Sequence, residues 1–165
     1  RGLARKGRPA KGASALIVGS GGVGSAIAVA MAEAEVGRLA LYDTRSEATE
    51  KLADRLQQFF PKLSIQVGSN DPAGFEIVVN ATPMGMEPGD PLPVDVERIS
   101  KETMVGEVVM KQEETPLLRA AQAKGCLTQI GTDMLFEQIP AYLAFLRLPT
   151  TSTENLRSLS RIRYQ

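Results

Sequence analysis

The stretch Ala15-Leu16-Ile17-Val18-Gly19-Ser20-Gly21-Gly22-Val23-Gly24 decides the fold of this 165-residue chain. An apolar run, expected to form a buried strand, leads directly into glycines with the spacing G-x-G-x-x-G. A helical pattern then follows, with apolar residues at Ile27, Met31 and Ala34. Strand, tight turn and helix N-terminus in this order form a phosphate site, because the helix start offers free N–H groups and partial positive charge. We therefore predict a dinucleotide site here; a glycine-rich turn without a ligand is the alternative.

Each glycine of the turn has its own expected role. Gly19 permits the tight turn, Gly21 lets the backbone approach a pyrophosphate, and Gly24 lets the helix pack close to the strand. Asp43 ends the next predicted strand, nineteen residues after Gly24. A carboxylate at that place can accept hydrogen bonds from the adenosine ribose. The alternative for Asp43 is a helix-entry aspartate beside Thr44.

The rest of the chain alternates apolar strands with helical patterns. Strands are predicted at 14–18, 38–42, 63–67, 76–80, 103–110 and 127–130. Helices are predicted at 23–34, from the capping box Thr44-x-x-Glu47 to Pro61, at 94–99, from Thr115-Pro116 to Gly125, and at 133–146. This alternation predicts an α/β fold, a doubly wound, Rossmann-like parallel sheet of about six strands.

The composition excludes several classes of function. Apolar residues make up 43%, charged residues 23%, and the formal net charge is zero, so nothing global favours nucleic acid as a partner. No apolar run approaches the ~20 residues of a membrane span, so we expect no membrane partner. The absence of histidine removes Ser-His-Asp and Cys-His catalysis, and we expect no metal site. The single cysteine, Cys126, is expected to be a small buried residue and fits a cytoplasmic protein.

Three regions are expected along the chain. Residues 1–12 carry five basic residues and no acid, which suggests a linker or the start of a fragment rather than a nucleic-acid arm. Residues 13–148 form the dinucleotide-binding domain. Residues 149–165 form a basic amphipathic tail, expected to dock on the parent protein; its pattern is Leu156, Leu159 and Ile162 with Arg157, Arg161 and Arg163. Because the chain begins with Arg, we expect it to be a piece of a longer protein or to be processed at its start.

Four segments resemble the shikimate/quinate dehydrogenase family, specifically its C-terminal NAD(P)-binding domain. They are Val18 to Gly24, Val79-Asn80-Ala81-Thr82-Pro83-Met84-Gly85-Met86, Glu114-Thr115-Pro116-Leu117-Leu118, and Gly131-Thr132-Asp133-Met134-Leu135-Phe136-Glu137-Gln138. Their order and spacing agree from about Ala13 to Leu146. The resemblance implies an oxidoreductase that transfers hydride between NAD(P) and a ring hydroxyl of shikimate, quinate or a related cyclic hydroxy acid, as in aromatic amino acid biosynthesis.

The resemblance also implies roles for individual residues. The pyrophosphate would lie on Gly19, Ser20, Gly21, Gly22, Val23 and Gly24. The nicotinamide half would lie beside Asn80, Ala81, Thr82, Met84, Val108, Gly131 and Met134. Gln138 would bind substrate hydroxyls. The adenosine ribose would face Asp43, Thr44 and Arg45.

The chain departs from the family pattern at three positions. Glu107 and Met110 stand where the family has an aspartate and a substrate-binding tyrosine, and Asp133 replaces a glycine next to the cofactor. The family's proton-transfer lysine and aspartate come from an N-terminal substrate lobe, so we assign no catalytic residue in this chain. Lys111 matches no catalytic position and is expected to be a solvated lysine.

The cofactor and partners follow from these comparisons. Family members that use NADP commonly have Asn-Arg-Thr where this chain has Asp43-Thr44-Arg45, so we expect NAD in preference to NADP. The expected partners are a small-molecule substrate and the substrate lobe of the same parent protein, and a homodimer is a further option. The alternative function is a stand-alone dinucleotide-binding module without catalytic activity.

Overall fold

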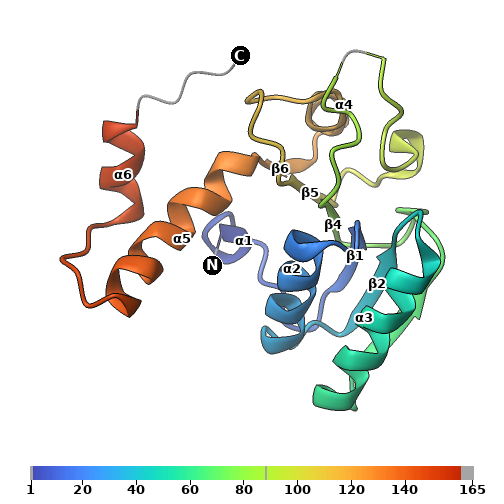
Figure 1. Ribbon diagram of the computed structural model, residues 1–165. Helices are drawn as coiled ribbons and strands as arrows, with labels where there is room; N and C mark the ends of the chain where they lie inside the picture. Colours follow the sequence, from blue (N-terminus) through green and yellow to red (C-terminus); the bar gives the residue numbers. More distant parts are fainter. Residues whose placement is uncertain (1, 88, 161–165) are drawn as a thin grey trace.

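A six-stranded parallel sheet with strand order β3-β2-β1-β4-β5-β6 organises the computed structural model, which describes residues 2–87 and 89–160 (Figure 1). Every neighbouring pair of strands runs parallel. The strands are β1 Ser14–Val18, β2 Arg38–Tyr42, β3 Ser64–Val67, β4 Ile77–Asn80, β5 Met104–Glu107 and β6 Leu127–Gln129. The order reverses between β1 and β4, where ligands of such sheets bind. The predicted α/β doubly wound fold is confirmed.

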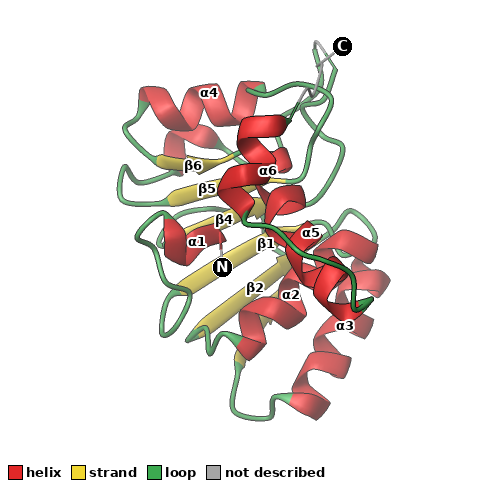
Figure 2. Cartoon of the chain, turned by 90° about the vertical axis from the view of Figure 1, so that its left-hand side faces the viewer, coloured by secondary structure: helices red, strands yellow, loops and turns green. Residues whose placement is uncertain are grey.

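Helices cover both faces of the sheet (Figure 2). They are α1 Gly2–Arg5, α2 Gly22–Glu33, α3 Ser46–Phe59, the 3-10 helix η1 Val96–Arg98, α4 Pro116–Ala123, α5 Gly131–Phe145 and α6 Thr153–Leu159. In Figure 2, α1, α5 and α6 lie on the near side of the sheet. No helix within the described ranges is long and apolar enough to cross a membrane.

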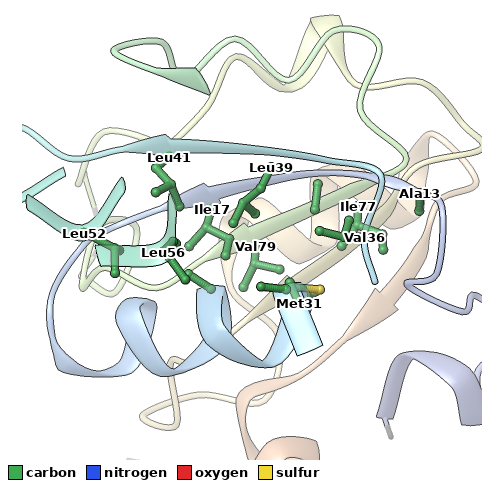
Figure 3. Packing of buried hydrophobic residues seen from close by; sticks show 13 residues of the cluster. Ala13, Ile17, Met31, Val36, Leu39, Leu41, Leu52, Leu56, Ile77 and Val79 are labelled. Atoms are coloured by element: carbon green, nitrogen blue, oxygen red, sulfur yellow. The ribbon is translucent and has the colours of Figure 1, made fainter. Parts of the chain in front are cut away.

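The core has two layers, because successive residues of a strand face opposite sides of the sheet. Ile17 and Leu39 face α2 and α3, where Met31 and Leu56 pack against them (Figure 3). The alternate residues face α4; this second layer includes Leu16, Val18, Val78, Val105, Leu117 and Leu118. The central strands are therefore buried on both faces, which explains their continuous apolar sequences.

Most predicted elements are shifted by one or two residues at their ends, and two predictions differ from the structure in a larger way. The prediction that the capping box Thr44-x-x-Glu47 opens a helix is wrong. Helix α3 begins at Ser46, and its N-cap residue Arg45 makes no side-chain hydrogen bond to the helix. The Asp43 carboxylate already accepts the Arg45 N–H at 2.9 Å, and this bond sets the entry to the helix. The strand predicted at 103–110 is also too long, because β5 ends at Glu107. Val108 donates one more bond, to the Asn80 carbonyl at 3.2 Å, before the chain leaves the sheet.

The basic N-terminal segment forms the short helix α1 and makes ion pairs with α5. Lys6 pairs with Asp133 at 2.8 Å, and the Nε atom of Arg5 lies 3.1 Å from Glu137 of α5. These contacts hold α1 against α5. The boundaries of the three regions stay a prediction, and Arg1, Arg161, Ile162 and Arg163 lie outside the described residues.

Candidate nucleotide-binding site

The glycine turn joins β1 to α2 with the geometry that its spacing predicts. Gly19 has a φ of +107°, in a region that favours glycine, and its N–H donates to the Tyr42 carbonyl at 2.6 Å. A Cβ atom on Gly24 would lie 1.9 Å from the Gly19 carbonyl oxygen, so no larger residue fits there. A Cβ on Gly21 or Gly22 would have no neighbour within 4 Å. The turn is therefore tightly packed below and open above.

The start of α2 is free to bind an anion. Its N-cap residue is Gly21, which has no side chain to cap the first N–H groups. The space around the α-carbons of Gly21 and Gly22 is open, and Val23 is exposed beside them. Ser20 is buried, and its hydroxyl bonds to the Thr49 hydroxyl at 3.1 Å, so it supports the turn from below. Uncapped donors and open space fit the pyrophosphate of a dinucleotide.

Asp43 connects the glycine turn to the start of α3. Its carboxylate accepts the Ser20 N–H at 2.7 Å and the Arg45 N–H at 2.9 Å, and its side chain is 10% exposed. Burial alone would raise the pKa of Asp43, but these two hydrogen bonds and the Arg45 charge outweigh it, and the pKa is lowered. The group is therefore an anion at neutral pH, with remaining lone pairs for ribose hydroxyls. Thr44 and Arg45 are exposed around it.

The loop after β4, residues 80–84, lies against the glycine turn, and we call it the Asn80 loop. Asn80 is buried; its amide oxygen accepts the Thr82 N–H at 3.0 Å and the Thr82 hydroxyl at 2.6 Å. Its amide N–H donates to the Met84 carbonyl at 3.1 Å. A Cβ on Gly19 would lie 2.8 Å from the Ala81 carbonyl oxygen. The structure thus brings the glycine turn and the Asn80 loop together at the switch point of the sheet.

The remaining predicted residues lie on β5, α5 and their connections. A Cβ on Gly131 would lie 2.1 Å from the Val109 carbonyl oxygen, so the start of α5 touches the segment that contains Val108. Val108 in turn bonds to Asn80, which links both to the Asn80 loop. Met134 is half-buried on α5. Gln138 lies one turn further along and accepts a hydrogen bond from the Tyr142 hydroxyl at 3.3 Å. Its role toward a substrate stays a prediction.

Asp133 has partners that sequence reasoning missed. It is 4% exposed, and its carboxylate pairs with Lys6 of the N-terminal segment and Arg157 of α6. Burial alone would raise its pKa, but the bonds from Lys6 and Arg157 lower it. One turn later, Glu137 pairs with Arg5, which also pairs with Glu154. We call these six residues the ion-pair cluster. The sequence indicated it only by the two acids, Asp133 and Glu137, that stand four residues apart.

Glu107 is the second buried acid that sequence reasoning did not place. It ends β5, is 4% exposed and pairs in strand register with Asn80. Neither carboxylate oxygen makes a hydrogen bond of good geometry to a described residue, although the Thr115 and Asn80 side chains lie beside it. Nearby Lys111 pairs instead with Glu87 and is 43% exposed, as expected for a surface lysine. Of two surface hollows, of about 510 and 540 Å³, the second is lined in part by Ser20 of the glycine turn, and neither contains a residue of the Asn80 loop.

Curated proteins similar to this chain include quinate/shikimate and shikimate dehydrogenases. No family model matches the chain. The quinate/shikimate dehydrogenase (NAD(+)) of Corynebacterium glutamicum is 38% identical over 143 residues, which are 82% of this chain and 50% of that protein. The shikimate dehydrogenase (NADP(+)) of Nitrobacter winogradskyi is 31% identical over 147 residues, 88% and 52% of the two chains.

The fold gives the same match. The structure of quinate dehydrogenase from Corynebacterium glutamicum in complex with NAD is similar with a TM-score of 0.82 and 34% identity. The match covers 96% of this chain and 58% of that one. The chain therefore spans only about half the length of the relatives that it matches.

Proposed function

Since this chain belongs to the shikimate/quinate dehydrogenase family over the half of those proteins that it spans, we propose that it is the cofactor-binding domain of such a dehydrogenase. Its substrate would be a shikimate-like cyclic hydroxy acid, and its setting the cytoplasm. The observation that carries the proposal is the start of α2, which has no side-chain cap and borders open space. The glycine turn that precedes this helix contacts the Asn80 loop. When bound, the cofactor supplies the hydride chemistry.

The residues of this chain bind and orient the cofactor in this proposal. The N–H groups at the start of α2 hold the pyrophosphate, and the Asp43 carboxylate accepts bonds from the ribose. The Asn80 loop, Val108 and the start of α5, with Met134, frame the nicotinamide. Gln138 binds substrate hydroxyls. The proton acceptor belongs to the substrate lobe of the parent protein, the partner that we propose, and a homodimer is a further option.

We propose NAD rather than NADP as the cofactor because of Asp43. The 2′-phosphate of NADP would face a carboxylate that Ser20 and Arg45 hold in its ionised form. At ~4 Å and an effective dielectric constant of ~20, each pair of like charges costs of order 4 kcal/mol before screening. Arg45 opposes this preference, since its exposed guanidinium can turn onto a phosphate. The NAD-dependent relative from Corynebacterium glutamicum also supports the assignment.

Calorimetric titration with NAD and NADP tests the proposal. Wild-type protein should bind NAD more tightly, Gly21→Val should lose binding because its side chain fills the phosphate space, and Asp43→Asn should lose the preference. Ala30→Val, on the exposed side of the same helix, is the matched control and should bind as wild type does. Unchanged affinity of a folded Gly21→Val protein, or tighter binding of NADP by wild type, would contradict the proposal.

Turnover distinguishes the domain from a complete enzyme. Residues 1–165 alone should not oxidise shikimate or quinate, because general acid–base help contributes about 10²–10⁴-fold and no such group is assigned here. Robust NADH production would show that the active site is misplaced. Binding without turnover, by a native gene product of this length, would favour the stand-alone binding module.

A further inference from the structure

The Glu107 carboxyl group is buried at the carboxyl edge of the sheet, directly beside the Asn80 loop. Its exposure is 4%, and neither oxygen makes a hydrogen bond of good geometry to a described residue, although the Asn80 and Thr115 side chains lie beside it. Buried polar groups in proteins are nearly always partnered, and an unpartnered buried carboxylate is costly. Such a group at the edge of a proposed cofactor site needs a physical account.

The neighbours of Glu107 each hold a reserve hydrogen-bond donor. The Asn80 amide gives one N–H to the Met84 carbonyl, which leaves its second N–H. The Thr115 hydroxyl accepts the Leu118 N–H at 3.3 Å as the N-cap of α4, which leaves its O–H proton. Hydrogen bonding by both side chains would lower the pKa of Glu107. Burial has the larger effect, and it raises the pKa.

Charged groups on the surrounding elements do not change this balance. In the segment after β5, Lys111 pairs with Glu87 of the loop after β4, and Glu113 is exposed. On α4, the Arg119 guanidinium donates to the Glu114 carbonyl at 2.7 Å, at the surface. On α5, Asp133 and Glu137 pair with cations of the ion-pair cluster. Burial and two neutral neighbours therefore govern the charge of Glu107.

We propose that Glu107 is a positioning residue that holds the Asn80 loop ready for the nucleotide while its carboxyl group is neutral, and loosens that loop when it loses its proton. The inference rests on the proposed function. A neutral carboxyl leaves the Asn80 amide to Met84, which keeps residues 80–84 in place. An ionised carboxylate attracts the second Asn80 N–H and the Thr115 O–H or admits water, which turns the Asn80 amide and so weakens its bond to the Met84 carbonyl. Because binding excludes water, nucleotide favours the neutral form, and affinity falls as pH rises through the raised pKa.

The test is NADH affinity, measured by fluorescence titration from about pH 5.5 to about pH 9. NADH is the probe because its nicotinamide ring carries no positive charge that would attract an ionised Glu107. Wild-type affinity should fall about 3- to 10-fold across the range, which corresponds to a pKa about half a unit to one unit higher in the complex. Glu107→Gln keeps the shape without the charge, so its affinity should stay near the low-pH value throughout. Glu50→Gln removes an exposed carboxylate on α3 and should keep the wild-type profile.

The outcomes separate the two proposals. NADH binding with the same pH profile in wild type and Glu107→Gln overturns the role of Glu107 alone. Absence of NADH binding at every pH overturns the proposed function. If Glu107→Gln does not fold, carbon NMR of the wild-type carboxyl groups decides: the Glu107 signal must titrate above the ordinary range of Glu and move further upward with NADH. A signal that NADH does not move also overturns the inference.

Discussion

Replacing Asp133 by Asn should destabilise the protein, because it removes the acid on which two terminal segments converge. The Asp133 carboxylate is 4% exposed and pairs with Lys6, just after α1, and with Arg157 of α6. An Asn side chain has nearly the same shape and can still accept one hydrogen bond, but carries no charge. The variant therefore isolates the charge of Asp133 from its packing.

The magnitude follows from the exposure of the cations left behind. Breaking a fully buried pair costs about 3–5 kcal/mol, whereas an exposed pair contributes about 0–1 kcal/mol. Lys6 and Arg157 are 37% and 35% exposed, so water can hydrate them once the acid is gone. We expect an intermediate loss of about 2 kcal/mol, which lowers Tm by about 4–8 °C for a chain of this size.

Thermal unfolding of wild type and variant measures this loss, and pH gives an independent readout. The hydrogen bonds from Lys6 and Arg157 outweigh burial and lower the pKa of Asp133. Its contribution is therefore fully present above the ordinary Asp pKa and is lost as pH falls toward the lowered value. The difference between wild type and variant should shrink in acid and, because the cations are partly exposed, in high salt. A variant within about 0.5 kcal/mol of wild type at neutral pH would refute the reasoning.

Three further predictions concern single residues. Gly24→Ala should lower the free energy of unfolding by at least about 1–3 kcal/mol in chemical denaturation, because its Cβ would lie 1.9 Å from a carbonyl oxygen. Gly21→Ala places its Cβ in free space and should stay within about 1 kcal/mol of wild type. Equal losses in the two variants would contradict the packing of the turn. Thr115→Ala should lose about 1 kcal/mol or more, since it removes the cap that accepts the Leu118 N–H; a change below about 0.5 kcal/mol in urea unfolding would show that the cap is unimportant. Cys126 should react slowly with thiol reagents in the folded protein, because it is 7% exposed and burial raises the pKa of its thiol; a rate equal to that in urea would contradict this.

Local sequence signals predicted the strands and the glycine turn because their causes are local. β1 and β2 have the predicted bounds, since continuous apolar runs identify strands buried on both faces. The helix start at Thr115-Pro116 was also predicted, because a capping side chain and the N–H that it accepts are only three residues apart. The same signal failed at Thr44, where Asp43 bonds to Ser20, 23 residues away, and to Arg45, and so sets the start of α3.

The ion-pair cluster could not be predicted, because its members are far apart in the sequence. Arg5 and Glu154 are 149 residues apart, and no pattern in either segment indicates the other. The burial of Glu107 was hidden for a related reason. A strand-end acid resembles a solvated one until the elements packed over it, here the Asn80 loop and α4, are known.

The central position of β1 has a consequence for the order of folding. β1 pairs with β2 after a separation of 24 residues, but with β4 only after 62, because Ala15 pairs with Ile77. Closing the longer loop costs more chain entropy before its contacts form. We therefore expect the β1-α2-β2 unit to form early and β4 to join it in the rate-limiting step. On a ribosome, the glycine turn then gains its second wall, the Asn80 loop, only after the residues up to that loop have been made.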